Sequence, residues 1–172
     1  MVLRLLAITF MFCLCSCDQN IKKTSTVEIE NIDKKTTISV YDFKKFEPLL
    51  HKKNDTTYVI NFWATWCKPC VKELPYFEEL HSNYKDENVK VILVSLDMES
   101  QIDSKLKPFI EKNNIKSKLI LLDDPDANAW ISKIDSTWSG AIPATLIYKN
   151  QKKKFYEKSF NYESLEKALK NL

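Results

Sequence analysis

The chain has 172 residues, which suits one domain with terminal extensions better than two full domains. Apolar residues make up 44% of it, enough for a buried core, and the single glycine excludes collagen-like repeats and glycine-rich phosphate loops. Lysine and arginine number 26 against 23 acidic residues, and Arg4 is the only arginine. Because base reading and phosphate clamping favour guanidinium groups, we expect no binding to nucleic acid.

Residues 1–16 have the layout of a secretory signal peptide. Arg4 supplies the positive charge, and residues 5–14 form an apolar run too short to span a membrane, which takes about 20 residues. Residues 14–17, Leu-Cys-Ser-Cys, resemble the bacterial lipobox, which implies cleavage before Cys17 and lipidation of its thiol. We therefore predict a membrane-anchored lipoprotein on the periplasmic side of the bacterial cell envelope. An ordinary secretory signal and an uncleaved anchor are the alternatives.

Residues 17–36 follow as the lipidated cysteine and a polar, charged tether with no sustained hydrophobic period. Val27, Ile29 and Ile32 alternate in part, so an edge strand within the tether stays open as an alternative. Export would place the rest of the chain outside the reduced cytosol, where a disulfide can persist. The folded body is expected over residues 37–172.

Segments typical of strands and of helices alternate along this body. Strands are expected at β-branched and aromatic runs, which cover residues 37–40, 57–63, 89–96, 118–122, 144–149 and 153–159. Helices are expected where apolar residues recur at steps of three and four, over residues 41–53, 68–84, 101–113, 126–134 and 162–172. Pro108 is expected to sharpen or split the third helix, and Asp126 to cap the fourth. The alternation predicts an α/β domain that ends in an antiparallel hairpin and a helix.

The five cysteines fall into two groups: three crowd the first 17 residues, and Cys67 and Cys70 stand in the body. The segment Cys-Lys-Pro-Cys directly follows a buried strand and opens a helix. A helix N-terminus stabilises a thiolate through its partial positive charge and free N–H groups, so Cys67 is expected to be exposed and reactive. Cys70 lies three residues on, in the first turn, where it can close a disulfide with Cys67 and resolve a mixed one.

Two other interpretations compete with a redox pair. A structural zinc site takes four ligands, and the body adds only His51 and His81. His81 lies about three turns beyond Cys70, too far along the same helix to share a metal with it. A permanent structural disulfide is the second alternative, but this bridge closes too short a loop to add much stability. We expect a redox-active pair, with no metal and no cofactor.

Residues 62–70, Phe-Trp-Ala-Thr-Trp-Cys-Lys-Pro-Cys, resemble the active-site signature of the thioredoxin superfamily. The continuation Glu73-x-Pro75, with Asn61 upstream, is similar to the membrane-anchored envelope branch, the TlpA/ResA-like thiol–disulfide oxidoreductases. The resemblance covers about residues 37–172. It implies a thioredoxin-like fold, with a central mixed sheet, helices on both faces and an extra helix-and-strand insertion at residues 101–122.

A second match, Gly-Ala-Ile-Pro-Ala-Thr at residues 140–145, resembles the cis-proline loop of that superfamily. This match implies that Ile142 and Pro143 face the disulfide and bind the backbone of a substrate chain, with an ordinary trans-proline loop as the alternative. Trp66 is expected to be partly exposed in the docking surface. Trp138 is expected either to line the same groove or to pack in the core.

Asn61 stands where thioredoxin has a buried acid, and an amide cannot take a proton. Glu73, one turn after Cys70, is therefore the candidate for proton transfer to the thiols, provided that burial raises its pKa. The alternative is a solvated Glu73 paired with Lys72 or Lys68.

The leading functional hypothesis is a thiol–disulfide oxidoreductase, acting as a reductase of protein disulfides in the envelope. Its expected partners are proteins with disulfides or thiols and an upstream membrane or envelope electron donor, and we expect a monomer. The client stays open among an apocytochrome, another oxidoreductase and a general disulfide substrate. A thiol peroxidase, which needs a lone cysteine and a nearby arginine, and an envelope copper chaperone, which uses thiolate ligands, are the alternatives.

Overall fold

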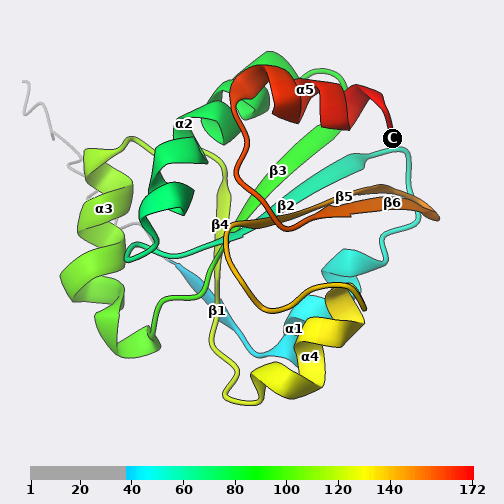
Figure 1. Cartoon of the computed structure of the whole chain (residues 1–172). Coiled ribbons are helices and arrows are strands. Elements are labelled where there is room, and N and C mark those ends of the chain that lie inside the picture. The colour runs from blue at the N-terminus through cyan, green and yellow to red at the C-terminus, as the bar shows by residue number, and fades with distance from the viewer. Residues whose placement is uncertain (1–37) are drawn as a thin grey trace, which may run out of the picture. The chain divides into compact units, whose positions relative to one another are not determined.

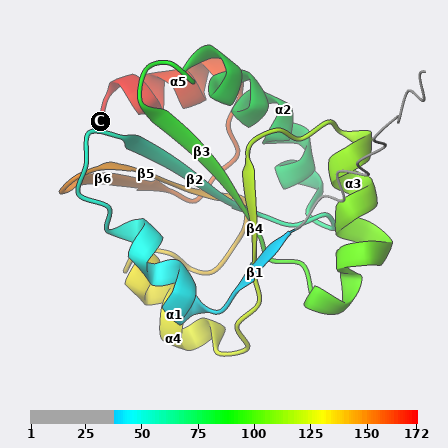
Figure 2. The ribbon, with the colours of Figure 1, turned by 180° about the vertical axis from the view of Figure 1, so that it is seen from behind.

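The computed structural model describes residues 38–172, in which a six-stranded sheet has helices on both faces (Figure 1, Figure 2). The strand order is β1-β4-β3-β2-β5-β6. The expected signal peptide, the lipidated Cys17 and the tether lie outside the described residues. Within residues 38–172, no helix combines the length and the apolar character that a membrane span requires.

Most of the expected strands and helices are present, several with the expected bounds. The strands are β1 (Ser39–Tyr41), β2 (Thr57–Trp63), β3 (Val89–Ser95), β4 (Lys118–Leu122), β5 (Ala144–Lys149) and β6 (Lys152–Tyr156). The α-helices are α1 (Phe43–Phe46), α2 (Lys68–Asn83), α3 (Lys107–Lys112), α4 (Ala127–Ile134) and α5 (Tyr162–Lys170). The predictions for β2, β4 and β5 are confirmed residue for residue, and Asp126 caps α4 as predicted.

Strand β2 lies at the centre of the sheet. It pairs in parallel with β3, with Thr57 opposite Val89, and antiparallel with β5 on its other side. Every residue of β2 after Thr57 is buried, as expected for a strand covered by helices on both faces. The turn that follows β2 therefore begins at the end of a strand that is buried in the core.

Strand β4 lies between β1 and β3, parallel to both. Ser39 of β1 pairs with Ile120, and Ile92 of β3 pairs with Lys118. The chain reaches β4 from β3 through the helical residues 99–112, which confirms the predicted insertion of a helix and a strand. The inserted strand β4 thus separates β1, the edge strand, from β3.

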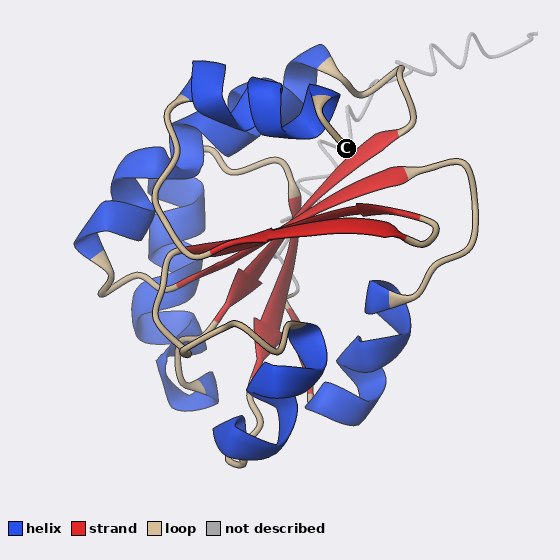
Figure 3. Ribbon diagram, turned by 45° about the vertical axis from the view of Figure 1, so that its right-hand side comes forward, coloured by secondary structure: helices blue, strands red, loops and turns tan. Residues whose placement is uncertain are grey.

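Two hydrophobic clusters form the core, one on each face of the sheet, and Figure 3 shows the helices on both sides of the strands. One cluster includes Leu74, Phe77 and Leu80 of α2 and Leu165 of α5. The other includes residues of α1 and α4, among them Phe46 and Trp130. The sheet thus contributes side chains to two cores at once, and the strands that carry the site are held from both faces.

Several bounds differ from the sequence prediction, and the largest differences are at α1, in the third helix and at the end of β6. The helix expected over residues 41–53 is only α1, followed by a 3₁₀ turn at Glu47–Leu50, because Pro48 has no N–H to continue an α-helix. The helix expected over residues 101–113 is split, which confirms the effect expected of Pro108: a π-helical turn covers Ile102–Leu106, and Pro108 lies in the first turn of α3. Strand β6 ends at Tyr156, three residues early, because its partner β5 begins at Ala144, directly after a proline.

Candidate active site

The cysteine pair lies where β2 passes into α2. Cys67 has extended backbone angles and is the N-cap of α2, while Cys70 lies within its first turn. A hydrogen bond from Cys67 N to Ala64 O, 3.1 Å, closes the turn that joins the two elements. Pro69 fits the start of the helix because the N–H it lacks would have no partner within that helix.

Cys67 and Cys70 are joined by a disulfide. The backbone N–H of Cys70 also donates to Cys67 Sγ, at 3.3 Å, so a peptide dipole points at this sulfur. The prediction of an exposed Cys67 is wrong for this oxidised form, because only 5% of the residue is exposed. The Cys67 sulfur is bonded to that of fully buried Cys70, and Ile142 O lies 3.7 Å from it. Cys67 remains the more accessible of the two cysteines.

The Ile142–Pro143 peptide is cis, which confirms the predicted cis-proline loop. The carbonyl oxygen of Ile142 lies 3.7 Å from Cys67 Sγ, so residues 75 positions apart meet at the disulfide. Gly140, two residues earlier, has a φ of +93°, which side-chain-bearing residues rarely adopt. The loop therefore approaches the sulfur with its backbone.

Glu157, just past β6, ties this loop down. Its carboxylate accepts hydrogen bonds from the N–H groups of Ser139 and Ala141, each at 3.1 Å, and from the Ser139 hydroxyl. The Ser139 side chain and these backbone donors hold the pKa of Glu157 below its usual value. Trp138 Nε1 donates to Ala141 O at 2.8 Å, and its ring packs in the core against Phe62, so the core alternative for Trp138 is the correct one.

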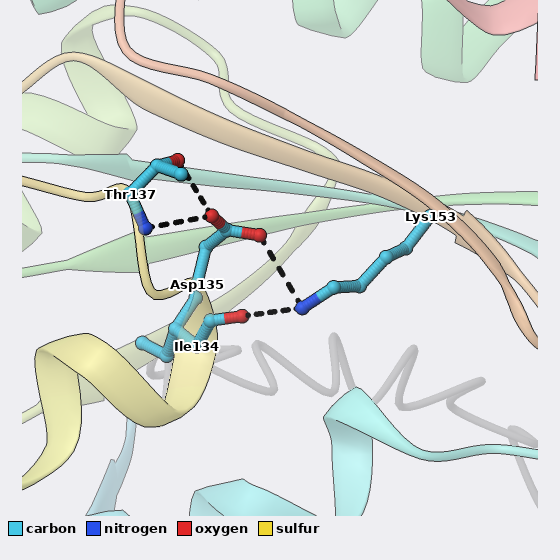
Figure 4. Close-up of polar contacts among 4 residues, drawn as sticks. All are labelled: Ile134, Asp135, Thr137 and Lys153. Carbon is cyan, nitrogen blue, oxygen red and sulfur yellow. Dashed lines mark hydrogen bonds and ion pairs between the residues drawn. The ribbon is translucent and has the colours of Figure 1, made fainter.

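A second set of contacts fixes the start of the loop (Figure 4). Lys153 Nζ of β6 lies 3.3 Å from Asp135 Oδ2 and donates to Ile134 O at 3.2 Å. Asp135 Oδ1 accepts from the backbone N–H and hydroxyl of Thr137. Burial alone would raise the pKa of Asp135, but the Thr137 donors and the Lys153 ammonium outweigh burial and lower it. The hairpin therefore holds both the start and the end of the loop that carries Pro143.

Glu73 lies one turn after Cys70 and is buried, with 1% of the residue exposed. Its Oε1 accepts from Asn61 Nδ2 at 2.9 Å and its Oε2 from Phe160 N at 2.7 Å. Burial raises the pKa of Glu73 to about 7, and the two hydrogen bonds limit the rise. The alternative of a solvated Glu73 paired with a lysine is thus wrong for this structure.

Asp97 is a second buried carboxylate near the cysteines, and the sequence prediction missed it. It accepts from the backbone N–H and hydroxyl of Thr65, at 3.0 and 2.6 Å, and from the Ser95 hydroxyl at 2.7 Å. These bonds join the end of β3 to the turn that precedes Cys67. The available signal was a polar pair, Ser95 and Asp97, directly after a buried strand, where sites in α/β sheets gather.

Trp66 and Met98 are the two large apolar side chains exposed among the described residues, each to 64%. Trp66 precedes Cys67, and Met98 follows the Asp97 that is bonded to Thr65, so both belong to the disulfide end of the molecule. The exposure predicted for Trp66 is confirmed. Trp63 is fully buried in the same cluster as both cysteines and packs on Phe109, with ring centroids 5.3 Å apart.

Residues 26–153 match the model of the AhpC/TSA family, which covers well over half of the chain. The chain belongs to this family. Among curated proteins, the thiol-disulfide oxidoreductase ResA of Bacillus thuringiensis subsp. konkukian is 42% identical over 57 residues, which are 33% of this chain and 31% of that protein. The sporulation thiol-disulfide oxidoreductase A of Bacillus subtilis is 32% identical over 63 residues, 37% of this chain and 38% of that protein. The matched part thus spans about a third of these curated relatives.

Solved structures show the same fold at lower identity. The thioredoxin-related protein of Neisseria meningitidis serogroup B superposes with a TM-score of 0.59 at 22% identity, over 69% of this chain and 85% of that one. StoA of Bacillus subtilis gives a TM-score of 0.52 at 22% identity, over 67% and 83%. The predicted thioredoxin-like α/β fold is confirmed, and this AhpC/TSA family member resembles ResA as expected.

Proposed function

We propose that the protein is a thiol–disulfide oxidoreductase that reduces protein disulfides through Cys67 and Cys70. The observation that carries the proposal is the position of Cys67, which caps α2 and accepts a hydrogen bond from Cys70 N while bonded to Cys70. The same N–H and helix terminus would stabilise a Cys67 thiolate in the reduced form. The thiol–disulfide oxidoreductase names of ResA and of the sporulation protein support this activity.

The reaction starts from the dithiol form. The Cys67 thiolate attacks one sulfur of the client disulfide, forms a mixed disulfide and releases the other client sulfur as a thiolate, which takes up a proton. Cys70 then attacks Cys67 Sγ, restores the disulfide seen here and releases the second client thiolate. Two electrons leave the protein in each cycle, and a dithiol donor in the envelope returns them.

Glu73 is the proposed proton acceptor for Cys70. Cys70 is fully buried, so its thiol needs a nearby base to form the attacking thiolate. A carboxyl with a pKa of about 7 can take and return that proton near neutral pH. Asn61 and Phe160 N hold the carboxyl in place through its two oxygens.

The client backbone is proposed to lie along Ile142 and Pro143, with Trp66 packing against its side chains. The Ile142 carbonyl is already 3.7 Å from Cys67 Sγ, which puts main-chain hydrogen bonding and sulfur attack within one site. The 64% exposure of Trp66 leaves its ring free to contact a partner. The client is a protein disulfide, for which an apocytochrome is one example.

We further propose that the protein works as a monomeric lipoprotein of the bacterial envelope, anchored through Cys17 on the periplasmic side. The signal-like residues 1–16 and the Leu-Cys-Ser-Cys segment support this location. Metabolic labelling with a palmitate analogue tests the anchor, since the Cys17→Ala variant should lose the label.

A trapping experiment tests the activity. The Cys70→Ser variant should retain a client as a mixed disulfide with Cys67, visible as a dithiothreitol-sensitive band, whereas Cys67→Ser should trap nothing. Wild-type protein should reduce insulin, and both variants should lose about two orders of magnitude of that rate. If both single variants reduced insulin at the wild-type rate, the proposal would be wrong.

A thiol peroxidase is the second candidate. The chain has no arginine after Arg4 to polarise a peroxide, and the two body cysteines share one helical turn, which favours dithiol exchange. Hydrogen peroxide consumption by the reduced protein separates the two activities. The oxidoreductase should consume peroxide no faster than a small-molecule thiol of the same pKa.

A further inference from the structure

The loops at the amino ends of the parallel strands carry a concentration of lysines. We call this surface the lysine face; it comprises Lys52, Lys53, Lys85, Lys90, Lys116, Lys118, Lys149 and Lys152. The pairings of β2, β3 and β5 put these loops at the same end of the strands, because Thr57 pairs with Val89 and Tyr58 with Tyr148. The start of α2 lies at the opposite end of β2 (Figure 1).

The lysine face is far more basic than the rest of the molecule. Its loops, residues 51–56, 84–90, 115–118 and 149–152, carry eight lysines and three acidic residues. The remainder of residues 38–172 carries 13 lysines and 16 acidic residues, so it is slightly acidic. Of the three acids, Asp55 is paired with Lys149 at 2.7 Å. Nearby Glu78 is occupied by the backbone N–H groups of Lys116 and Ser117, at 2.7 and 3.1 Å.

A cavity of about 590 Å³ opens in the part of this face formed by residues 52, 85–90 and 118. It exists because β4 starts late, with Lys118 opposite Ile92, so β3 projects beyond it. Its rim includes Lys52, Lys85, Lys90 and Lys118. Four ammonium groups around one depression can surround a phosphate more closely than lysines spread on a convex surface.

The other residue types near these lysines indicate which kind of partner the lysine face binds. A nucleic-acid surface usually combines arginine with exposed aromatic rings, but residues 38–172 contain no arginine and the exposed tryptophan lies at the disulfide end. A protein interface usually has exposed apolar anchors, and the described part exposes Trp66 and Met98 only at that same end. Point-like ammonium groups without anchors suit a dense layer of phosphate headgroups.

We propose that the lysine face binds anionic phospholipid headgroups at a membrane surface. Bound in this way, the protein presents its disulfide away from the membrane, since the seven-residue β2 separates the lysine face from the Cys67 turn by roughly 20 Å. The inference does not depend on the redox activity. A flexible tether alone would let the folded body take any orientation relative to the membrane, whereas binding through the lysine face favours a single orientation.

Vesicle co-sedimentation of the folded body tests the proposal. Residues 38–172 lie in one compact unit, and both hydrophobic clusters lie within it, so this body can be used without its N-terminal segment. It should sediment with phosphatidylcholine vesicles that contain about one-third phosphatidylglycerol, not with pure phosphatidylcholine, and about 0.5 M salt should release it.

A charge-matched pair of variants locates the surface. Changing Lys85, Lys90, Lys116 and Lys118 to Gln should weaken vesicle binding about tenfold or more. Changing Lys44, Lys105, Lys158 and Lys167 to Gln alters net charge equally, outside the lysine face, and should weaken it less than about threefold. Equal losses, no binding by the wild type, or a preference for a DNA duplex over these vesicles would each overturn the proposal. Circular dichroism checks that both variants are folded.

Discussion

Asn61 gives Glu73 a hydrogen-bond partner in either protonation state. Its Nδ2 donates to Glu73 and to the Thr145 hydroxyl, at 2.9 and 3.1 Å, while its buried Oδ1 has no partner among the described residues. If Glu73 takes up a proton, a flip of the Asn61 amide turns its Oδ1 towards Glu73 and Thr145. The carboxylic O–H of Glu73 and the hydroxyl of Thr145 can then donate to that oxygen. A charged partner at residue 61 would favour one state only. An amide there fits a carboxyl that must gain and lose a proton.

The raised pKa of Glu73 predicts a pH dependence of stability. Its folded pKa is about 7, above the usual pKa of 4.5, so its stabilising contribution is complete below pH 4.5 and is lost as the pH rises through 7. The full loss is on the order of 3 kcal/mol. In urea unfolding of the oxidised proteins, the unfolding free energy of Glu73→Gln relative to that of wild type should therefore rise by up to this amount between pH 4 and pH 8.

Glu79→Gln is the control for this measurement, because Glu79 lies exposed on the same helix. Its unfolding free energy should follow that of wild type across the pH range. A Glu73→Gln curve parallel to wild type would show that Glu73 titrates normally in the folded protein.

We expect the stability of the protein to depend on the hydrogen bonds by which Asp97 holds the turn before Cys67. Replacing Asp97 by Asn leaves one acceptor oxygen for three donors from Thr65 and Ser95. Loss of a buried, charge-assisted hydrogen bond should cost about 1.5–3 kcal/mol of unfolding free energy. The matched change at exposed Asp123 should cost less than about 0.5 kcal/mol. Chemical denaturation of both variants in the oxidised state decides the point, and equal stability would contradict it.

At the scale of elements, the loop that ends in Pro143 depends on the hairpin beside it. Removing the Glu157 carboxylate frees the N–H groups of Ser139 and Ala141. We expect Glu157→Ala to raise the KM for insulin about threefold to tenfold with little change in kcat, because the loop is less well ordered for client binding. A small aromatic disulfide, which does not need the loop backbone, should react at the wild-type rate.

Glu163→Ala, on the exposed first turn of α5, serves as the control for this change. It should leave both substrates unaffected. Equal losses for insulin and the small disulfide in Glu157→Ala would mean that the loop acts on Cys67 itself.

The elements predicted best from sequence are those whose signal is local. Strand β2 is a run of β-branched and aromatic residues, and α2 has an unbroken apolar spacing, so their bounds were predicted within one residue. The end of β6 depends on where its partner begins, which the sequence of β6 does not encode. The burial of Cys67 likewise depends on Ile142, 75 residues away, and the position of Asp97 on Thr65, 32 residues away. These errors come from long-range contacts, whereas the shortening of α1 comes from the local effect of Pro48.

At the scale of the whole molecule, the two hydrophobic clusters share one sheet. Trp63 lies in the cluster with α2 and Trp130 in the cluster with α4. Because β2 contributes Val59 to the first and Ile60 to the second, neither face can melt without exposing the other. We expect a single two-state transition for the body. In a variant that retains only Trp63 and in one that retains only Trp130, the fluorescence midpoint in urea should equal the far-ultraviolet circular dichroism midpoint of that same variant, and separated midpoints within either variant would contradict a shared core.

Strand β1 is a three-residue edge strand that pairs with β4, and it is the first element within residues 38–172. Mechanical tension applied from the N-terminus would reach this strand first and peel it from β4 one residue at a time. Phe43 and Phe46, buried directly after it, would arrest the peeling before it reaches β2. Strand β1 could therefore detach under force while the two cysteines keep their geometry.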